Sequence, residues 1–283
     1  DEGAIFASKL FGYSLNKSEL TQDDRETLVI NNKVIEFEAS SSSYAENGIK
    51  LIGVIDGENA GDGLDDIDLS YDGTRLAIGQ MGYDGNDGIV KIYDYYSTQQ
   101  YDTTTNTFTN WLKLKEYVGI SGDYAGWHVE LSNSGSVLGY SSPFADTSSH
   151  SRGGTATGRI ISDPVFTYTT FESNSASALF GGGFDMNSDG TIFAIGSSNT
   201  GLVDIYQESN HIGQLSGSQS MYGSFGSSVS LSGNGTRIAV GSRNTNTVYV
   251  YDYDSSSGWI QVGSDITGTG SFGIEVVLSS DGN

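Results

Sequence analysis

The chain has 283 residues, 36% of them hydrophobic, which is enough to form a buried core in one large domain or two small ones. Its 35 acidic residues outnumber 13 Lys and Arg and give a formal net charge of −22, which argues against nucleic acid and anionic membranes as partners. The chain has no cysteine, so disulfides, zinc–thiolate sites and cysteine nucleophiles are excluded. No apolar run approaches the ~18 residues that a membrane span needs.

The chain is built from an internal repeat, whose copies start near residues 11, 63, 125, 180, 225 and 272. Each full copy holds four short runs in which apolar and polar residues alternate, as they do in a β-strand. In the fifth copy these runs are 228–232, 236–241, 247–253 and 259–263. Asn-Gly or Asp-Gly joins the first two runs in most copies and suits a tight hairpin.

Four antiparallel strands in each repeat predict an all-β fold. We expect a β-propeller of four-stranded antiparallel blades, with five full repeats plus a partial sixth. Residues 1–283 would form a single propeller domain that is part of a longer chain. A solenoid of stacked sheets is the alternative architecture, and the variable repeat length favours the propeller.

The repeat follows the pattern FG-x-S-V-x-L-S-x-D-G-T-R-x-A-x-G, most clearly in the copy that starts at Phe225. This pattern resembles the FG-GAP repeat of integrin α-subunit propellers and their microbial relatives, over residues 11–283. The resemblance implies a non-enzymatic adhesion module, extracellular or on the cell surface, that recognises a protein or glycan ligand through loops on one face. The alternative is a structural subunit of a surface appendage, sheath or particle coat, assembled from copies of itself. A glycan-cleaving propeller enzyme is the third reading.

FG-GAP repeats often carry calcium in the loop between their first two strands. Asp185, Asn187 and Asp189 match three ligand positions of such a loop, because they place oxygen ligands at alternate positions. Phe193 stands where the last carboxylate of the loop is required. We therefore treat these three residues as a candidate calcium site that lacks one ligand.

The other copies lack this last carboxylate as well. Their first ligand positions are Asp68, Glu130 and Ser230, and each has an apolar residue at the ninth position. We interpret these loops as metal-free hairpins, so the expected cofactor is none, or calcium at the Asp185 loop. We interpret a further acidic cluster as a solvated turn; its members are Asp56, Glu58, Asp62, Asp65 and Asp66.

Few residues suit a histidine-based active site, because the chain has only three His. His128 lies in a first strand beside Trp127, where packing or an exposed strand face explains it. His150 and Arg152 lie in a Ser/Gly-rich insert, and Tyr101 lies in a Thr/Tyr-rich one. We predict that these three residues belong to binding loops on a raised rim.

Asn16 and Asn234 begin glycosylation sequons, which have meaning only in a secreted eukaryotic chain. Two such matches are close to what chance gives in a chain rich in Asn, Ser and Thr.

Overall fold

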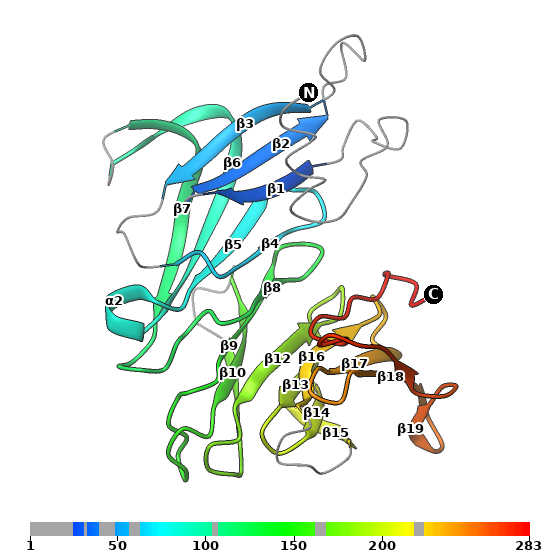
Figure 1. The fold of residues 1–283 in the computed structure, drawn as a ribbon. Coiled ribbons are helices and arrows are strands. Elements are labelled where there is room, and N and C mark those ends of the chain that lie inside the picture. The colour runs from blue at the N-terminus through cyan, green and yellow to red at the C-terminus, as the bar shows by residue number, and fades with distance from the viewer. Residues whose placement is uncertain are drawn as a thin grey trace.

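The computed structural model describes residues 25–30, 33–39, 49–56, 63–103, 107–161, 168–217 and 224–283. These residues form antiparallel sheets of mostly short strands, with one helical turn, α2 (Tyr83–Asn86), between two of the strands (Figure 1). The prediction of an all-β fold is confirmed.

Four sheets repeat one arrangement, in which four consecutive strands pair antiparallel in chain order. The first contains β4 (Asp66–Leu69), β5 (Arg75–Gln80), β6 (Ile89–Asp102) and β7 (Thr107–Val118). The second contains β8 (Val129–Leu131), β9 (Val137–Ser142), β10 (Thr155–Ile160) and β11 (Tyr168–Glu172). The third contains β12 (Phe180–Met186), β13 (Ile192–Ser197), β14 (Leu202–Gln207) and β15 (Asn210–Ser216). The fourth contains β16 (Phe225–Leu231), β17 (Arg237–Ser242), β18 (Thr247–Asp254) and β19 (Gly258–Gln261), with β20 (Ile266–Thr267) also paired to β18. A three-stranded sheet of β1 (Arg25–Ile30), β2 (Lys33–Ala39) and β3 (Ile49–Asp56) precedes them.

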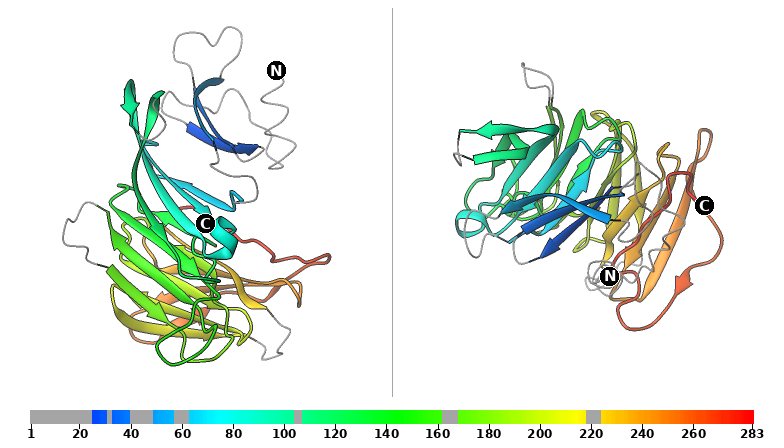
Figure 2. Two further views of the ribbon diagram at one scale, coloured as in Figure 1. Left: turned by 90° about the vertical axis from the view of Figure 1, so that its left-hand side faces the viewer. Right: turned by 90° about the horizontal axis from the view of Figure 1, so that it is seen from above.

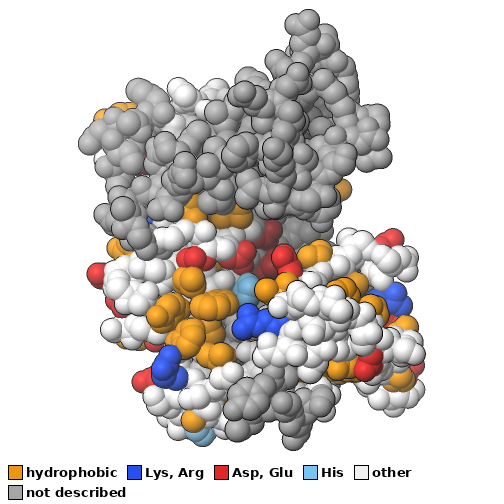
Figure 3. All heavy atoms as spheres, in the orientation of Figure 1, with side chains coloured by type: hydrophobic (Ala, Val, Ile, Leu, Met, Phe, Trp, Pro, Cys, Tyr) orange, Lys and Arg blue, Asp and Glu red, His pale blue; other side chains and the backbone are white. Residues whose placement is uncertain are grey.

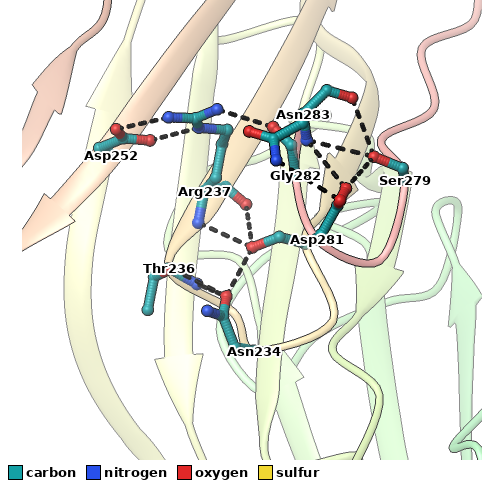
Figure 4. Close-up of polar contacts among 9 residues, drawn as sticks. Asn234, Thr236, Arg237, Asp252, Ser279, Asp281, Gly282 and Asn283 are labelled. Carbon is teal, nitrogen blue, oxygen red and sulfur yellow. Dashed lines mark hydrogen bonds and ion pairs between the residues drawn. The ribbon is translucent and has the colours of Figure 1, made fainter.

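The hairpins between first and second strands form where the Asn-Gly and Asp-Gly signals predict them. In the β16–β17 turn, the Asn234 Oδ1 atom accepts hydrogen bonds from Ser232 Oγ at 2.9 Å and from the Thr236 amide at 3.0 Å (Figure 4). Gly235 has a φ of +69°, a conformation that glycine adopts without steric cost. The local sequence therefore favours the turn, and Ile192 of the neighbouring blade leaves no room for a larger residue at Gly235.

The sheets lie side by side as a fan, with the first strand of each nearest the common axis (Figure 2). The core lies between neighbouring sheets: Val203 and Ile205 of the third sheet pack with Phe225 and Val240 of the fourth. A Cβ atom on Gly196 would collide with the carbonyl oxygen of Gly226, so close contact between these sheets requires glycine. This arrangement of four-stranded antiparallel sheets is that of β-propeller blades, as predicted.

The segment after β20 occupies the place of the first strand of a further blade. The Val276 and Leu278 amides donate to Ser228 Oγ and Ser230 Oγ, each at 3.0 Å. Arg237 Nη1 donates to the Gly282 carbonyl at 2.7 Å while its Nε and Nη2 atoms bind Asp252 (Figure 4). The partial sixth repeat thus begins as the other repeats do. That residues 1–283 form a single domain stays a prediction.

Candidate functional site

A cavity of about 610 Å³ lies on the axis, where the first strands of the blades meet. Equivalent positions of successive repeats supply one row of side chains in its wall: Asp68, Glu130, Asp185 and Ser230. The positions two residues earlier supply a second row, which contains Asp66, His128, Ser228 and Glu275. Because side chains alternate along a strand, both rows face the cavity while the residues between them pack into the blades.

Asp68 and Glu130 form a carboxyl pair in this wall, joined by a hydrogen bond between their side chains. The two oxygens of Asp68 also accept the Leu69 amide at 2.8 Å and the Leu131 amide at 2.6 Å. Burial raises the pKa of Asp68 to about 7, although these two amides act to lower it. Burial raises the pKa of Glu130 well above its ordinary range, and the neighbouring carboxylates raise it further.

Asp185 completes a group of three carboxyls from three blades. Burial raises its pKa to about 6, while hydrogen bonds from the Leu231 and Met186 amides act to lower it. Asp185, with a pKa of about 6, therefore ionises before Asp68, with a pKa of about 7, and the raised pKa of Glu130 favours its protonated form. Carboxyl groups that interact this closely exchange protons as a unit.

His128 places a ring beside the carboxyl cluster. Its Nε2 atom lies 3.1 Å from the Gly182 carbonyl and its Nδ1 atom 3.3 Å from an Asp66 carboxylate oxygen. Each ring nitrogen therefore lies within hydrogen-bonding distance of one acceptor. The same Asp66 oxygen accepts the Val129 amide at 2.9 Å, which fixes its position.

The arrangement suits acid–base chemistry, because neighbouring carboxyl groups have pKa values that differ. Among the described residues that line the cavity, five are acidic and none is Lys or Arg. The acidic members are Asp66, Asp68, Glu130, Asp185 and Glu275.

The three residues of the candidate calcium loop lie in different environments. Asp185 faces the cavity, whereas Asn187 is buried and its Oδ1 atom accepts the amides of Thr191 and Ile192 at 3.0 and 2.8 Å. Asp189 is exposed and also accepts the Thr191 amide. Within the described part of the chain, no group of three or more His, Asp or Glu is placed to hold a metal ion. The calcium site stays a prediction.

The predicted binding-loop residues fall in two places. His150 and Arg152 share the loop between β9 and β10, where the Arg152 guanidinium lies 5.0 Å from the centre of the Phe144 ring. Tyr101 lies near the end of β6, opposite Phe108 of β7, and its side chain is half exposed.

The remaining sequence predictions concern sequons and the acidic turn. Asn234 is exposed on its hairpin, and Asn16 lies outside the described residues. Asp66 contradicts the interpretation of its cluster as a solvated turn, since it lines the cavity and binds His128 and Val129. Asp65 is exposed, and one of its oxygens accepts the Met81 amide at 2.9 Å.

Sequence reasoning missed the carboxyl cluster, although the signal was present. Asp68, Glu130 and Asp185 occupy the same position of three successive repeats. In a propeller, equivalent positions of the first strands meet around the axis, so acidic residues at one such position converge.

Comparison with known proteins supports the fold. No family model matches the chain, and no curated protein matches it significantly. A structure from Desulfotomaculum acetoxidans, of a protein of unknown function, is similar with a TM-score of 0.56 at 14% identity, over 86% of this chain and 67% of that one. A proposed 6-phosphogluconolactonase of Bacteroides fragilis has a TM-score of 0.52 at 15% identity, over 83% and 65% of the two chains. The periplasmic gluconolactonase of Pseudomonas aeruginosa has a TM-score of 0.54 at 14% identity, over 83% and 64%.

These comparisons overturn the FG-GAP resemblance, because no family model matches and the similar structures include proteins named lactonases. The prediction of a non-enzymatic adhesion module, and that of a structural subunit, are wrong, since enzymes are named among the proteins of this fold. The chain spans about two thirds of the length of these structures. At 14–15% identity, the likeness shows that the chain has the β-propeller fold.

Proposed function

We propose that this chain carries the active site of a hydrolase that opens a small, polyhydroxylated lactone. The observation that carries the proposal is the convergence of Asp68, Glu130 and Asp185, from three blades, in the wall of one cavity. Burial raises the pKa of all three, to about 7 for Asp68 and about 6 for Asp185, and well above its ordinary range for Glu130. The names of two structures with this fold support the choice of a lactone as substrate.

Lactone hydrolysis needs a base and an acid in turn. Asp185 accepts a proton from a water molecule as the water oxygen bonds to the lactone carbonyl carbon. The bond between that carbon and the ring oxygen then breaks, and Glu130 gives its proton to the departing oxygen. The product is a hydroxy acid, and passage of the proton from Asp185 to Glu130, with Asp68 as the intermediate group, restores the starting state.

The charge of the wall favours an uncharged lactone. Five carboxyl groups line the cavity and, among the described residues, no Lys or Arg does, so a phosphorylated lactone meets electrostatic repulsion. The product carboxylate meets the same repulsion, which promotes its release. A neutral sugar lactone therefore fits the cavity better than its phosphate ester.

We also propose that the protein works outside the cytoplasm. The name of the Pseudomonas aeruginosa structure, a periplasmic enzyme, supports this location. In the described residues, no helix is long and apolar enough to cross a membrane.

The experiment is a titration of acid release from D-glucono-1,5-lactone at constant pH, with the spontaneous rate subtracted. We expect the wild-type protein to accelerate hydrolysis, and Asp185→Asn and Glu130→Gln each to lower kcat by about 10²–10⁴-fold. Asp252→Asn removes the same charge from a residue outside the cavity wall and should keep the wild-type rate. The 6-phosphate ester should be hydrolysed less efficiently.

Two results would refute the proposal. One is a wild-type protein that gives no acceleration over buffer with either lactone. The other is full activity in both Asp185→Asn and Glu130→Gln.

A further inference from the structure

Ser230 stands where the three preceding repeats have an acid. The equivalent residues are Asp68, Glu130 and Asp185, and all four line the cavity. Ser230 lies in β16 and is buried, with only 7% of its surface exposed. The proposed chemistry uses the three acids and leaves the serine without a role.

The Ser230 hydroxyl makes two hydrogen bonds of opposite sense. Its Oγ atom accepts the Leu278 amide of the sixth repeat at 3.0 Å. Its proton is donated to the Asp185 carboxylate of the preceding blade. An ionised acid at this position could accept the Leu278 amide, but it could not donate to Asp185, because a carboxylate has only acceptors. A hydroxyl side chain is therefore needed to connect the last repeat with Asp185.

Asp68 provides an internal comparison for this contact. Asp68 and Asp185 each accept two amides, one from the next residue and one from the following repeat. They differ in the equivalent side chain of the following repeat, which is Glu130 for Asp68 and Ser230 for Asp185. Burial raises the pKa of both carboxyl groups, to about 7 for Asp68 and to about 6 for Asp185, and the bond from Ser230 acts to lower the second value. The serine is thus one difference between two otherwise similar carboxyl groups.

Charged groups of other strands also line this cavity. They are Asp66, Asp68, His128, Glu130 and Glu275. The charge of His128 acts to lower the pKa of Asp185, and the charge of Asp185 acts to raise the pKa values of Asp68 and Glu130. Figure 3 shows acidic side chains beside a histidine on one face of the molecule. A substitution of Ser230 by a small side chain alters none of these groups, so it tests the hydroxyl alone.

We propose that Ser230 is a positioning residue for the Asp185 carboxylate. The chain of hydrogen bonds from the Leu278 amide through the Ser230 hydroxyl holds the carboxylate in place and stabilises its ionised form, which accepts a proton from water. The first strand of the sixth repeat therefore acts on the base through its backbone. The role of Asp185 as a base rests on the proposed function, whereas its hydrogen bond to Ser230 does not.

The first test measures the pKa of Asp185 without a substrate, by carbon-13 NMR of protein labelled at its aspartate carboxyl carbons. Asp185→Asn identifies the resonance, and EDTA in every sample removes calcium. Ser230→Ala should raise the pKa of Asp185 by about 1, because the ionised carboxylate loses a hydrogen bond. Ser230→Thr keeps the hydroxyl and should keep the wild-type value. The matched control is Ser228→Ala, since Ser228 Oγ accepts the Val276 amide at the same 3.0 Å, and it should also keep the wild-type value.

Three results would overturn the proposal. One is an unchanged pKa of Asp185 in Ser230→Ala, and another is an equal rise in Ser228→Ala. The third comes from Ser230→Asp, which restores the acid of the preceding repeats and serves if Ser230→Ala does not fold. This variant should raise the pKa of Asp185, because the new carboxylate repels it and cannot donate. An unchanged value would show that Asp185 does not depend on the residue at position 230.

The second test measures the reaction. The acid limb of the pH profile of kcat/KM for D-glucono-1,5-lactone should move up by about 1 in Ser230→Ala, so the rate below pH 6 should fall about tenfold, and Ser230→Thr should restore it. A limb that stays at the wild-type pH while the pKa of Asp185 rises would remove Ser230 from the reaction. If the wild-type protein hydrolyses no lactone, the proposed function fails, and the NMR titration still decides whether Ser230 positions Asp185.

Discussion

Replacement of Asp68 by asparagine removes a carboxyl group whose pKa burial raises from 3.8 to about 7. The unfolded chain gives up this proton above pH 3.8, whereas the folded protein keeps it until about pH 7. The group's contribution to stability is therefore complete below pH 3.8 and is lost as the pH rises toward 7. Each pKa unit corresponds to 1.36 kcal/mol, so ionisation of Asp68 lowers the free energy of unfolding by about 3 kcal/mol between pH 5 and pH 8.

Asp68→Asn has no such titration. It also weakens one of the hydrogen bonds from the Leu69 and Leu131 amides, at a cost of about 1–3 kcal/mol at every pH. The stability of the variant relative to the wild type should therefore rise by about 3 kcal/mol between pH 5 and pH 8. Only the change of this stability difference with pH tests the raised pKa of Asp68, because the lost hydrogen bond costs the same at every pH.

Urea unfolding at pH 5, 6, 7 and 8, followed by tryptophan fluorescence and circular dichroism, measures this difference. The matched control is Asp252→Asn, because a hydrogen bond from Arg237 lowers the pKa of Asp252. Ionised Asp252 therefore stabilises the protein at every pH above 3.8, the ordinary pKa of Asp, and this effect is lost only as the pH falls below the lowered pKa of the folded protein. The control should differ from the wild type by the same amount from pH 5 to pH 8. A difference for Asp68→Asn that stays constant within about 0.5 kcal/mol would refute burial of this carboxyl group.

Three further outcomes follow from the structure. Gly196→Ala should lower the free energy of unfolding in urea by about 3 kcal/mol or more, because the added methyl group collides with the carbonyl of Gly226. The control, Gly258→Ala, has open space around it and a positive φ, and it should cost only about 1–2 kcal/mol. Equal losses in the two variants would contradict the close contact between the sheets. Phe193→Ala should cost about 3–5 kcal/mol, since the ring is buried against its neighbours, and a loss under 1 kcal/mol measured by the same method would contradict that packing. The pH profile of kcat for lactone hydrolysis should fall below about pH 6, as Asp185 takes up the proton that prevents it from acting as a base; a rate that is unchanged down to pH 4.5 would remove Asp185 from the reaction.

The fold was accessible from the sequence because its signals are local. Alternation of apolar and polar residues predicts strands, and Asn234-Gly235 predicts the hairpin that the structure contains. Recurrence of this unit then predicts a propeller. The FG-GAP resemblance was misleading, because the pattern that carries it reflects structural requirements of a blade. Gly226, for example, has a φ of +81° and contacts Gly196 of the previous blade, a constraint of packing that carries no information about function.

The candidate site could not be predicted from single repeats, because its residues come from three blades. Asp68 and Asp185 each stand at the first ligand position of a calcium-loop pattern, and that pattern concerns one repeat at a time. Their raised pKa values arise from burial together in one cavity, which requires three blades. The sequence alone explains His128 by packing or an exposed strand face, because its partners, Asp66 and Gly182, lie 62 and 54 residues away.

The alternation of side chains along the first strands gives the cavity residues two tasks at once. In β8, Val129 and Leu131 pack into the core, while Glu130 between them faces the cavity. The cavity wall also joins the blades, since Asp68 accepts the Leu131 amide and Ser230 accepts the Leu278 amide, each from the following repeat. A substitution at such a position spares the apolar core, but it changes the cavity wall and the junction between two blades together.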